Sequence, residues 1–169
     1  MDKLRVGIIG CGKIAAIKRF PAMAKAKDRI EVIGFCDLIE ERAASAAAEF
    51  GDKGAKVSVD YRRKTSRSIL IHVLRPSNSH RVLTVDSLDA EKHVLCEKPM
   101  AATTADAKRM LTTAKRLGQK LTIGYQNRFR KDVQILQCAC EAGDLGDTYF
   151  AKAHALRRKQ VPTWGVFLV

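Results

Sequence analysis

Apolar residues in this chain gather in short runs, separated by longer stretches with helical periodicity. Several runs are apolar on consecutive residues instead of every second one, which is typical of strands buried on both faces of a parallel sheet. Strands are therefore predicted at residues 4–10, 30–37, 55–59, 69–74, 92–97 and 120–125. The stretches between them predict helices at about residues 13–25, 38–50, 80–90, 103–117 and 129–143. This alternation indicates a doubly wound α/β fold around a mostly parallel sheet.

Two boundaries of the fourth helix carry signals of their own. The hydroxyl of Thr103 can accept a bond from a free N–H group, and Asp106 faces the positive end of the helix. Gly118 follows the helix and tolerates the left-handed conformation that ends it. The tail from about residue 147 opens with a strand-like stretch and ends in apolar residues without a packing partner, so a truncated protein is expected.

The composition fits one domain and a fragment of another. The chain has 169 residues, of which 46% are hydrophobic, enough for one ordinary core. No apolar run approaches the ~18 to 20 residues that cross a bilayer, and the amino-terminal run lacks the cleavage site of a signal peptide. We therefore expect a cytoplasmic protein that has no membrane partner.

The five cysteines give no sign of a metal site or a disulfide framework. Their number is odd, and they contain no pair of C-x-x-C motifs. Cys138 and Cys140 are two residues apart on a predicted helix, so their side chains diverge. Reduced thiols and no metal site are expected.

The net charge of +13 raises the question of a polyanionic partner. Lysines and arginines are scattered through nearly every segment, without an aromatic-interleaved stripe, zinc-finger spacing or a basic tail. A solvated basic surface is the better interpretation, so no specific nucleic-acid partner is predicted. Nonspecific attraction would appear as DNA binding that falls steeply as salt rises.

A glycine-rich loop is the first candidate for chemistry. Residues 10–15, GCGKIA, fit G-x-G-x-x-G/A between a predicted strand and a predicted helix. In that setting the first glycine makes the tight turn, the second lets a pyrophosphate approach, and the small third residue lets helix pack on strand. Free N–H groups at the helix start would hold the phosphate. The cofactor-binding residues predicted here are Gly10, Gly12, Lys13 and Ile14.

Asp37 ends the second predicted strand, a little over ~20 residues past the loop, where a carboxylate would accept hydrogen bonds from ribose hydroxyls. Such a carboxylate would repel a 2′-phosphate. NAD is therefore favoured over NADP as the cofactor. The alternative role for Asp37 is to cap the helix that begins at Leu38.

Three further motifs lie at carboxyl ends of predicted strands, the edge where ligands bind in open α/β sheets. They are RPSNSH at 75–80, KHVLCEKPMA at 92–101 and GYQNRF at 124–129. Together with the glycine loop and Asp37, they resemble the amino-terminal domain of the glucose-fructose oxidoreductase and inositol dehydrogenase family, Gfo/Idh/MocA. The resemblance runs from about residue 3 to the last few residues, and EKP is its most specific element.

The resemblance implies a fold and a reaction. It implies a Rossmann NAD-binding domain at residues 1–125, followed at 126–169 by a connecting helix and the truncated beginning of an α/β substrate domain. The implied activity is reversible hydride transfer between NAD(P) and a small carbohydrate-like substrate, at a sugar or polyol hydroxyl or carbonyl. Family members often associate through the sheet of the second domain, so a homo-oligomer is implied as well.

The resemblance also assigns roles to residues. Lys98 is implied as the catalytic lysine, which hydrogen-bonds the reacting substrate oxygen and assists its proton transfer. Pro99 has no N–H and a restricted φ, so it ends the strand and fixes the direction of Lys98. Glu97 is implied as a cofactor-side contact and Asn127 as a residue at the nicotinamide end. Without its neighbours, Lys98 would be interpreted as a surface lysine after a strand.

The sequence departs from the family after the fourth strand, where Pro-Asn-x-x-His is usual. Pro76 and His80 keep their places, but Ser77 follows the proline and the asparagine comes one place late, as Asn78. All three of Pro76, Asn78 and His80 are carried over as cofactor-side residues. The alternatives for His80 are a helix cap and a core histidine.

Two larger departures concern residues 61–81 and the end of the chain. Residues 61–81 contain six Lys/Arg and no acid, whereas the family has a helix with acidic residues there. The two alternatives that explain this are a diverged surface and a reading-frame slip. The family's histidine acid/base lies in the second domain, beyond Val169. The chain is therefore expected to bind nucleotide and to turn over slowly or not at all. The alternative is a non-catalytic dinucleotide-binding module that senses redox state or supports a partner.

Overall fold

The computed structural model describes residues 2–62, 67–154 and 156. The chain divides into two units, one that extends to Gly124 and one that begins at Tyr125. Each unit is described by itself.

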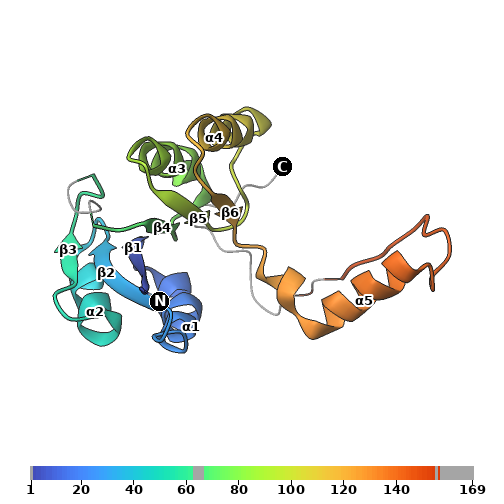
Figure 1. Ribbon diagram of the computed structural model, residues 1–169, viewed down its shortest axis with the longest axis horizontal. Helices are drawn as coiled ribbons and strands as arrows, with labels where there is room; N and C mark the ends of the chain where they lie inside the picture. Colours follow the sequence, from blue (N-terminus) through green and yellow to red (C-terminus); the bar gives the residue numbers. More distant parts are fainter. Residues whose placement is uncertain (1, 63–66, 155, 157–169) are drawn as a thin grey trace. The chain divides into compact units, whose positions relative to one another are not determined.

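The first unit is built on one parallel sheet with the strand order β3-β2-β1-β4-β5-β6 (Figure 1). Every strand lies inside its predicted range, so the sequence pattern is confirmed as that of a doubly wound α/β fold. The strands are β1 Leu4–Ile9, β2 Ile30–Cys36, β3 Lys56–Ser58, β4 Leu70–Val73, β5 His93–Cys96 and β6 Leu121–Ile123.

Helices cover both faces of this sheet and enclose two cores (Figure 1). On one face, Phe20 packs edge-to-face on Phe35 with ring centroids 5.7 Å apart. On the other face, Leu83 and Met110 pack against Ile71. The helices are η1 Ala15–Arg19, α1 Phe20–Ala24, α2 Glu40–Phe50, η2 Ser77–Ser79, α3 His80–Asp89 and α4 Thr104–Arg116.

The first helix differs in detail from its prediction. Within the predicted range 13–25, the segment η1 is π-helical and leads directly into α1. Pro21 explains the wider turn, because it has no N–H to donate and its ring pushes away the carbonyl of Ile17. The boundary signals of α4 are confirmed: the Asp106 N–H donates to Thr103 Oγ1 at 3.1 Å, and Gly118 has a φ of +66°.

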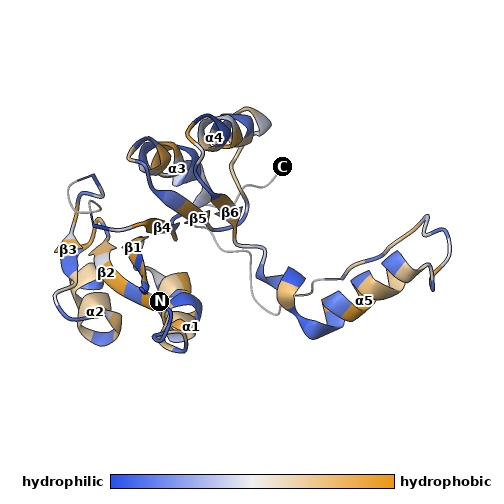
Figure 2. Ribbon diagram, viewed as in Figure 1, coloured by the Kyte–Doolittle hydropathy of each residue, from blue (hydrophilic) through white to orange (hydrophobic). Residues whose placement is uncertain are grey.

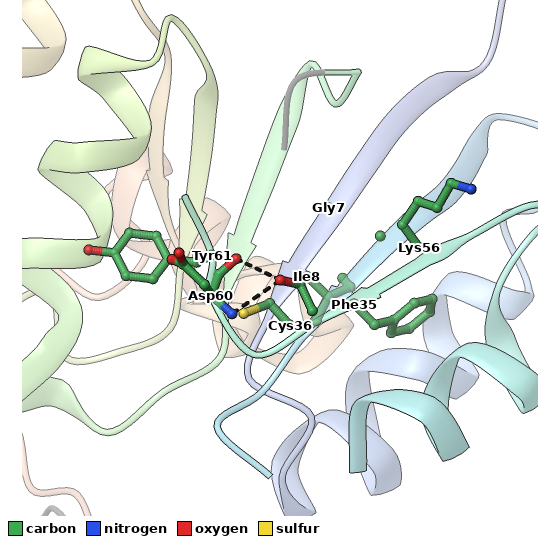
Figure 3. Close-up of a pocket in the computed structure, with 9 residues that line it drawn as sticks. Gly7, Ile8, Phe35, Cys36, Lys56, Asp60 and Tyr61 are labelled. Carbon is green, nitrogen blue, oxygen red and sulfur yellow. Dashed lines mark hydrogen bonds between the residues drawn. The ribbon is translucent and has the colours of Figure 1, made fainter. Parts of the chain in front are cut away.

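The connection from β3 to β4 contains no helix in its described parts, residues 59–62 and 67–69. It lies directly on the sheet, since a Cβ at Gly7 would stand 2.8 Å from Ser68 Oγ. Tyr61 anchors it by donating its hydroxyl to Asp86 Oδ2 of α3 at 2.6 Å. A hollow on the face of β1, β2 and β3 remains beside Asp60 and Tyr61 (Figure 3). The basic segment of residues 61–81 thus overlaps a connection whose described parts are not helical.

The second unit contains η3, Gln126–Phe129, and α5, Lys131–Ala142. Hydrophilic and hydrophobic segments alternate along α5 (Figure 2), and none of its residues is buried. The strand-like stretch from residue 147 forms no strand over 147–154, because a strand needs a neighbour to accept its backbone bonds. None of the helices in the described part of the chain has the length and apolar character that a bilayer crossing needs.

Candidate dinucleotide site

The carboxyl ends of four strands stand in line along one edge of the sheet. The Gly10 N–H donates to Cys36 O at 2.8 Å, and the Leu74 N–H donates to Ile9 O at 2.8 Å. The Glu97 N–H donates to Val73 O at 3.0 Å. The residues that follow β2, β1, β4 and β5 are therefore neighbours in that order.

This edge brings together Asp37, Gly10 and Lys98, which sequence analysis had placed at separate strand ends. Three strand spacings separate the ends of β2 and β5, roughly 14 Å. The strand order reverses between β1 and β4, and in open α/β sheets the crevice at such a reversal is where ligands bind. The geometry is that of a site for an elongated ligand.

The two glycines of the loop differ in their surroundings. Gly10 has a φ of +106°, and a Cβ there would stand 2.6 Å from Leu74 O, so only glycine fits. A Cβ at Gly12 would meet nothing within 4 Å. The backbone at Gly12 is thus open to an approaching group, which fits the pyrophosphate of a dinucleotide.

The start of the following helix is exposed except for one residue. The Ala16 N–H donates to Gly12 O at 3.1 Å, and Lys13 and Ile14 are exposed. Ala15 is buried at 1% exposure, so the small third residue of the motif packs against the sheet. Lys13 and Ile14 stand where a phosphate at the helix start would contact them.

Asp37 is buried, and both of its oxygens accept backbone bonds. The Cys11 N–H donates to Oδ2 at 2.8 Å and the Ile39 N–H donates to Oδ1 at 3.0 Å. Helix α2 begins at Glu40 with Ile39 as its N-cap residue, so Asp37 stands two residues ahead of the cap. Its carboxylate ties the glycine loop to the end of β2.

Arg75 is a residue of this edge that sequence analysis did not single out. Its Nη1 lies 3.8 Å from Asp37 Oδ2, and its side chain is 27% exposed. Its Cδ lies 3.0 Å from the position of a Cβ on Gly10. A basic residue directly before Pro76 at a strand end was the available signal.

His80 joins the loops that follow β4 and β5. Its Nε2 lies 2.6 Å from Arg75 O, and its Nδ1 lies 2.8 Å from Pro99 O. His80 is 1% exposed, which matches the alternative of a core histidine. Its ring therefore lies inside the protein and not on the solvent-facing surface of the edge. Pro76 is half-buried, and Asn78 is exposed in η2.

Glu97 and Lys98 point to different surroundings. The Glu97 carboxylate is buried and pairs with the guanidinium of Arg19 from η1. Lys98 is exposed and is followed by a cis peptide bond to Pro99. An exposed ammonium at the strand end can donate to a ligand atom.

Asn127 lies in η3 of the second unit and is exposed. Because it belongs to the other unit, its role at the nicotinamide end stays a prediction.

Two kinds of buried titratable group lie near the edge. Burial raises the pKa of the Cys11 thiol to about 12, and the negative charge of Asp37 adds to this. Burial lowers the pKa of His72 to about 3, and the positive charge of Arg19 adds to this. Neither ring nitrogen of His72 has a hydrogen-bond partner among the described residues. Both groups are therefore neutral at physiological pH.

A parallel sheet in this order, with a glycine turn at the reversal and an acid ending the next strand, defines the dinucleotide-binding Rossmann class. A family model described as an oxidoreductase family with an NAD-binding Rossmann fold, GFO_IDH_MocA, matches residues 4–125. The chain belongs to this family, which confirms the resemblance seen in its motifs.

Two curated relatives are identical to the chain at about a third of the aligned positions. D-glucoside 3-dehydrogenase of Escherichia coli K12 is 34% identical over 164 residues, which are 97% of this chain and 46% of the relative. Glucose-6-phosphate 3-dehydrogenase of Bacillus subtilis 168 is 34% identical over 165 residues, which are 95% of this chain and 45% of the relative. The chain thus spans about half the length of the curated relatives it matches.

Solved structures give the same result. The WlbA dehydrogenase of Chromobacterium violaceum, in complex with NADH and UDP-GlcNAcA, matches with a TM-score of 0.79 and 28% identity, over 85% of this chain and 41% of that one. KijD10, a 3-ketoreductase of Actinomadura kijaniata in complex with NADP and TDP-benzene, matches with a TM-score of 0.75 and 26% identity. The match covers 84% of this chain and 43% of KijD10. These two relatives bind different nicotinamide cofactors.

Proposed function

We propose that this chain is the nucleotide-binding part of an NAD(P)-dependent oxidoreductase that acts on a hydroxyl or carbonyl of a sugar or polyol. The observation that carries the proposal is the shared edge, where the open backbone at Gly12 stands between the ends of β2 and β5. The substrate class rests on the names of the relatives, which are glucoside and glucose-6-phosphate dehydrogenases.

In this proposal, residues 1–125 hold the dinucleotide and residues 126–169 begin the substrate domain. Backbone N–H groups from Gly12 to Ile14 bind the pyrophosphate, because the helix start leaves them without intrahelical partners. Pro76 and Asn78 line the crevice. His80 positions the loop after β5, because its ring contacts the carbonyl oxygen of Pro99.

Lys98 is the proposed catalytic residue. Its exposed ammonium donates a hydrogen bond to the reacting substrate oxygen and gives it a proton when a carbonyl is reduced, whereas the neutral amine takes the proton when a hydroxyl is oxidised. Glu97 keeps Lys98 in place, since its pairing with Arg19 fixes the end of β5. When bound, the nicotinamide accepts or supplies the hydride.

The test is a titration of the chain with NADH, followed by the change in nucleotide fluorescence. Saturable binding is expected, and Lys98→Ala is expected to leave the dissociation constant within about twofold, since Lys98 acts on the substrate oxygen and not on the dinucleotide. The control is Lys115→Ala, an exposed lysine in the last turn of α4. A chain that stays folded and shows no saturation up to millimolar NADH would contradict the proposal.

The second candidate is a non-catalytic dinucleotide-binding module that senses redox state or supports a partner. The observation that favours it is that Glu97, next to Lys98, is buried and paired with Arg19, and that His80 is 1% exposed, so neither is placed to relay a proton for Lys98. An assay of NADH formation with a panel of sugars and polyols separates the two. Sugar-dependent NADH formation that is lost in Lys98→Ala favours the oxidoreductase, and its absence beside tight NADH binding favours the module.

A further inference from the structure

The corner of the site near Asp37 presents a cation to solvent instead of an anion. The side chain of Asp37 is 2% exposed, and that of Arg75 is 27% exposed. Both carboxylate oxygens already accept backbone N–H groups, from Cys11 and Ile39. A ligand that reaches this corner therefore meets the guanidinium of Arg75 before it meets the carboxylate.

The stem of Arg75 crosses the glycine turn. Arg75 follows β4, its Cδ lies against Gly10 at the end of β1, and its Nη1 reaches toward Asp37 at the end of β2. The backbone of Arg75 is fixed by His80, whose Nε2 lies 2.6 Å from its carbonyl oxygen. The side chain thus spans from β4 to β2, above the strand that carries the phosphate-binding loop.

The guanidinium keeps its donors available. At 3.8 Å, the separation from Asp37 Oδ2 is an ion-pair distance and longer than a hydrogen bond. Within the residues that the structure describes, the Arg75 side chain donates no hydrogen bond. Guanidinium groups bind phosphate oxygens through paired N–H donors, which gives both affinity and direction.

We infer that Arg75 is a specificity-determining residue that binds the 2′-phosphate of NADP(H) and so makes the site accept this cofactor alongside NAD(H). An exposed carboxylate at the end of β2 excludes a 2′-phosphate by repulsion, and a nearby arginine accommodates it. Here the carboxylate is buried and its charge is balanced by Arg75. The inference rests on the proposed function, because it needs a dinucleotide at this edge.

The test compares the dissociation constants of NADH and NADPH for the chain and three variants. The chain is expected to bind the two within about threefold of each other, since no exposed acid opposes the extra phosphate. Arg75→Gln is expected to weaken NADPH by about tenfold or more, the worth of a charge-assisted bond, and NADH by less than about threefold. Arg75→Lys, which keeps the charge, restores part of the NADPH affinity.

The matched control is Arg116→Gln, which removes an arginine that is 62% exposed and paired with Asp89 on the surface. It is expected to change neither constant. Thermal unfolding of each variant checks that the fold is kept. As a second probe, 2′,5′-ADP is expected to bind more tightly than 5′-AMP in the chain and equally in Arg75→Gln.

Three results would overturn the inference. A chain that prefers NADH over NADPH by more than about thirtyfold, ~2 kcal/mol, keeps the proposed function but removes this role of Arg75. Equal loss of both cofactors in Arg75→Gln places the guanidinium on the pyrophosphate instead. A folded chain that binds neither cofactor overturns the proposed function together with the inference.

Discussion

Gly12→Val is expected to remove most of the NADH affinity of the chain while leaving its fold intact. A Cβ at Gly12 meets nothing within 4 Å, so the new side chain costs the folded protein little, within about 1 kcal/mol. In the proposed function, the space it fills is where the pyrophosphate approaches the backbone. Losing the phosphate contacts is expected to raise the dissociation constant about 100-fold or more, ~3 kcal/mol.

The measurement pairs NADH titration with thermal unfolding. Gly10→Ala is the informative comparison, because its Cβ would stand 2.6 Å from Leu74 O at a φ of +106°. That variant is expected to lose both stability and binding, whereas Gly12→Val loses binding alone. If Gly12→Val unfolds at the same temperature as the wild-type chain and binds NADH equally well, the loop does not hold the phosphate.

The second large effect concerns His72, which is buried at 2% exposure on β4. Its folded pKa of about 3 lies below the ordinary value of 6.5, so the unfolded chain takes up a proton at mildly acidic pH and the folded chain does not. The contribution to stability is therefore complete above pH 6.5 and falls as the pH drops toward 3. The loss amounts to about 1.4 kcal/mol per pH unit in this window.

His72→Leu is expected to remove this pH dependence. At pH 7.5 the variant is expected to be as stable as the wild-type chain or more so, by up to about 2 kcal/mol, since leucine leaves no buried nitrogen without a partner. At pH 4.5 its advantage is expected to grow by about 2.7 kcal/mol, two pH units of the same effect. Urea unfolding at the two pH values measures both differences.

The control for His72 is His154→Gln, which changes an exposed histidine of the second unit. It is expected to keep the pH dependence of the wild-type chain. Parallel loss of stability in the wild-type chain and His72→Leu between pH 7.5 and 4.5 would show that the burial of His72 does not cause the pH dependence.

The strands and the glycine turn could be predicted from sequence because their signals are local. A run of consecutive apolar residues, such as VGII at 6–9, encodes a strand buried on both faces. Thr103 and Gly118 act on backbone groups a few residues away, so their roles at the two ends of α4 could also be predicted. Parallel order then brought Asp37, Gly10 and Lys98 to one edge, since all parallel strands end on the same side.

What escaped prediction depends on contacts between distant residues. The bond from the Cys11 N–H to Asp37 spans 26 positions, and no local pattern shows that this carboxylate is buried under Arg75. His72 resembles any polar residue in a strand until its neighbours are known.

The central claim is that one dinucleotide lies along the carboxyl edge of the sheet, and amide chemical shifts measured during an NADH titration test it most directly. The account predicts saturable shift changes at the strand ends that form the edge, at residues 10–14, 37–39, 75–78 and 97–98. Changes confined to the opposite edge, around Leu4, Lys56 and His93 where strands begin, would contradict it, as would a folded chain whose amides do not respond at millimolar NADH.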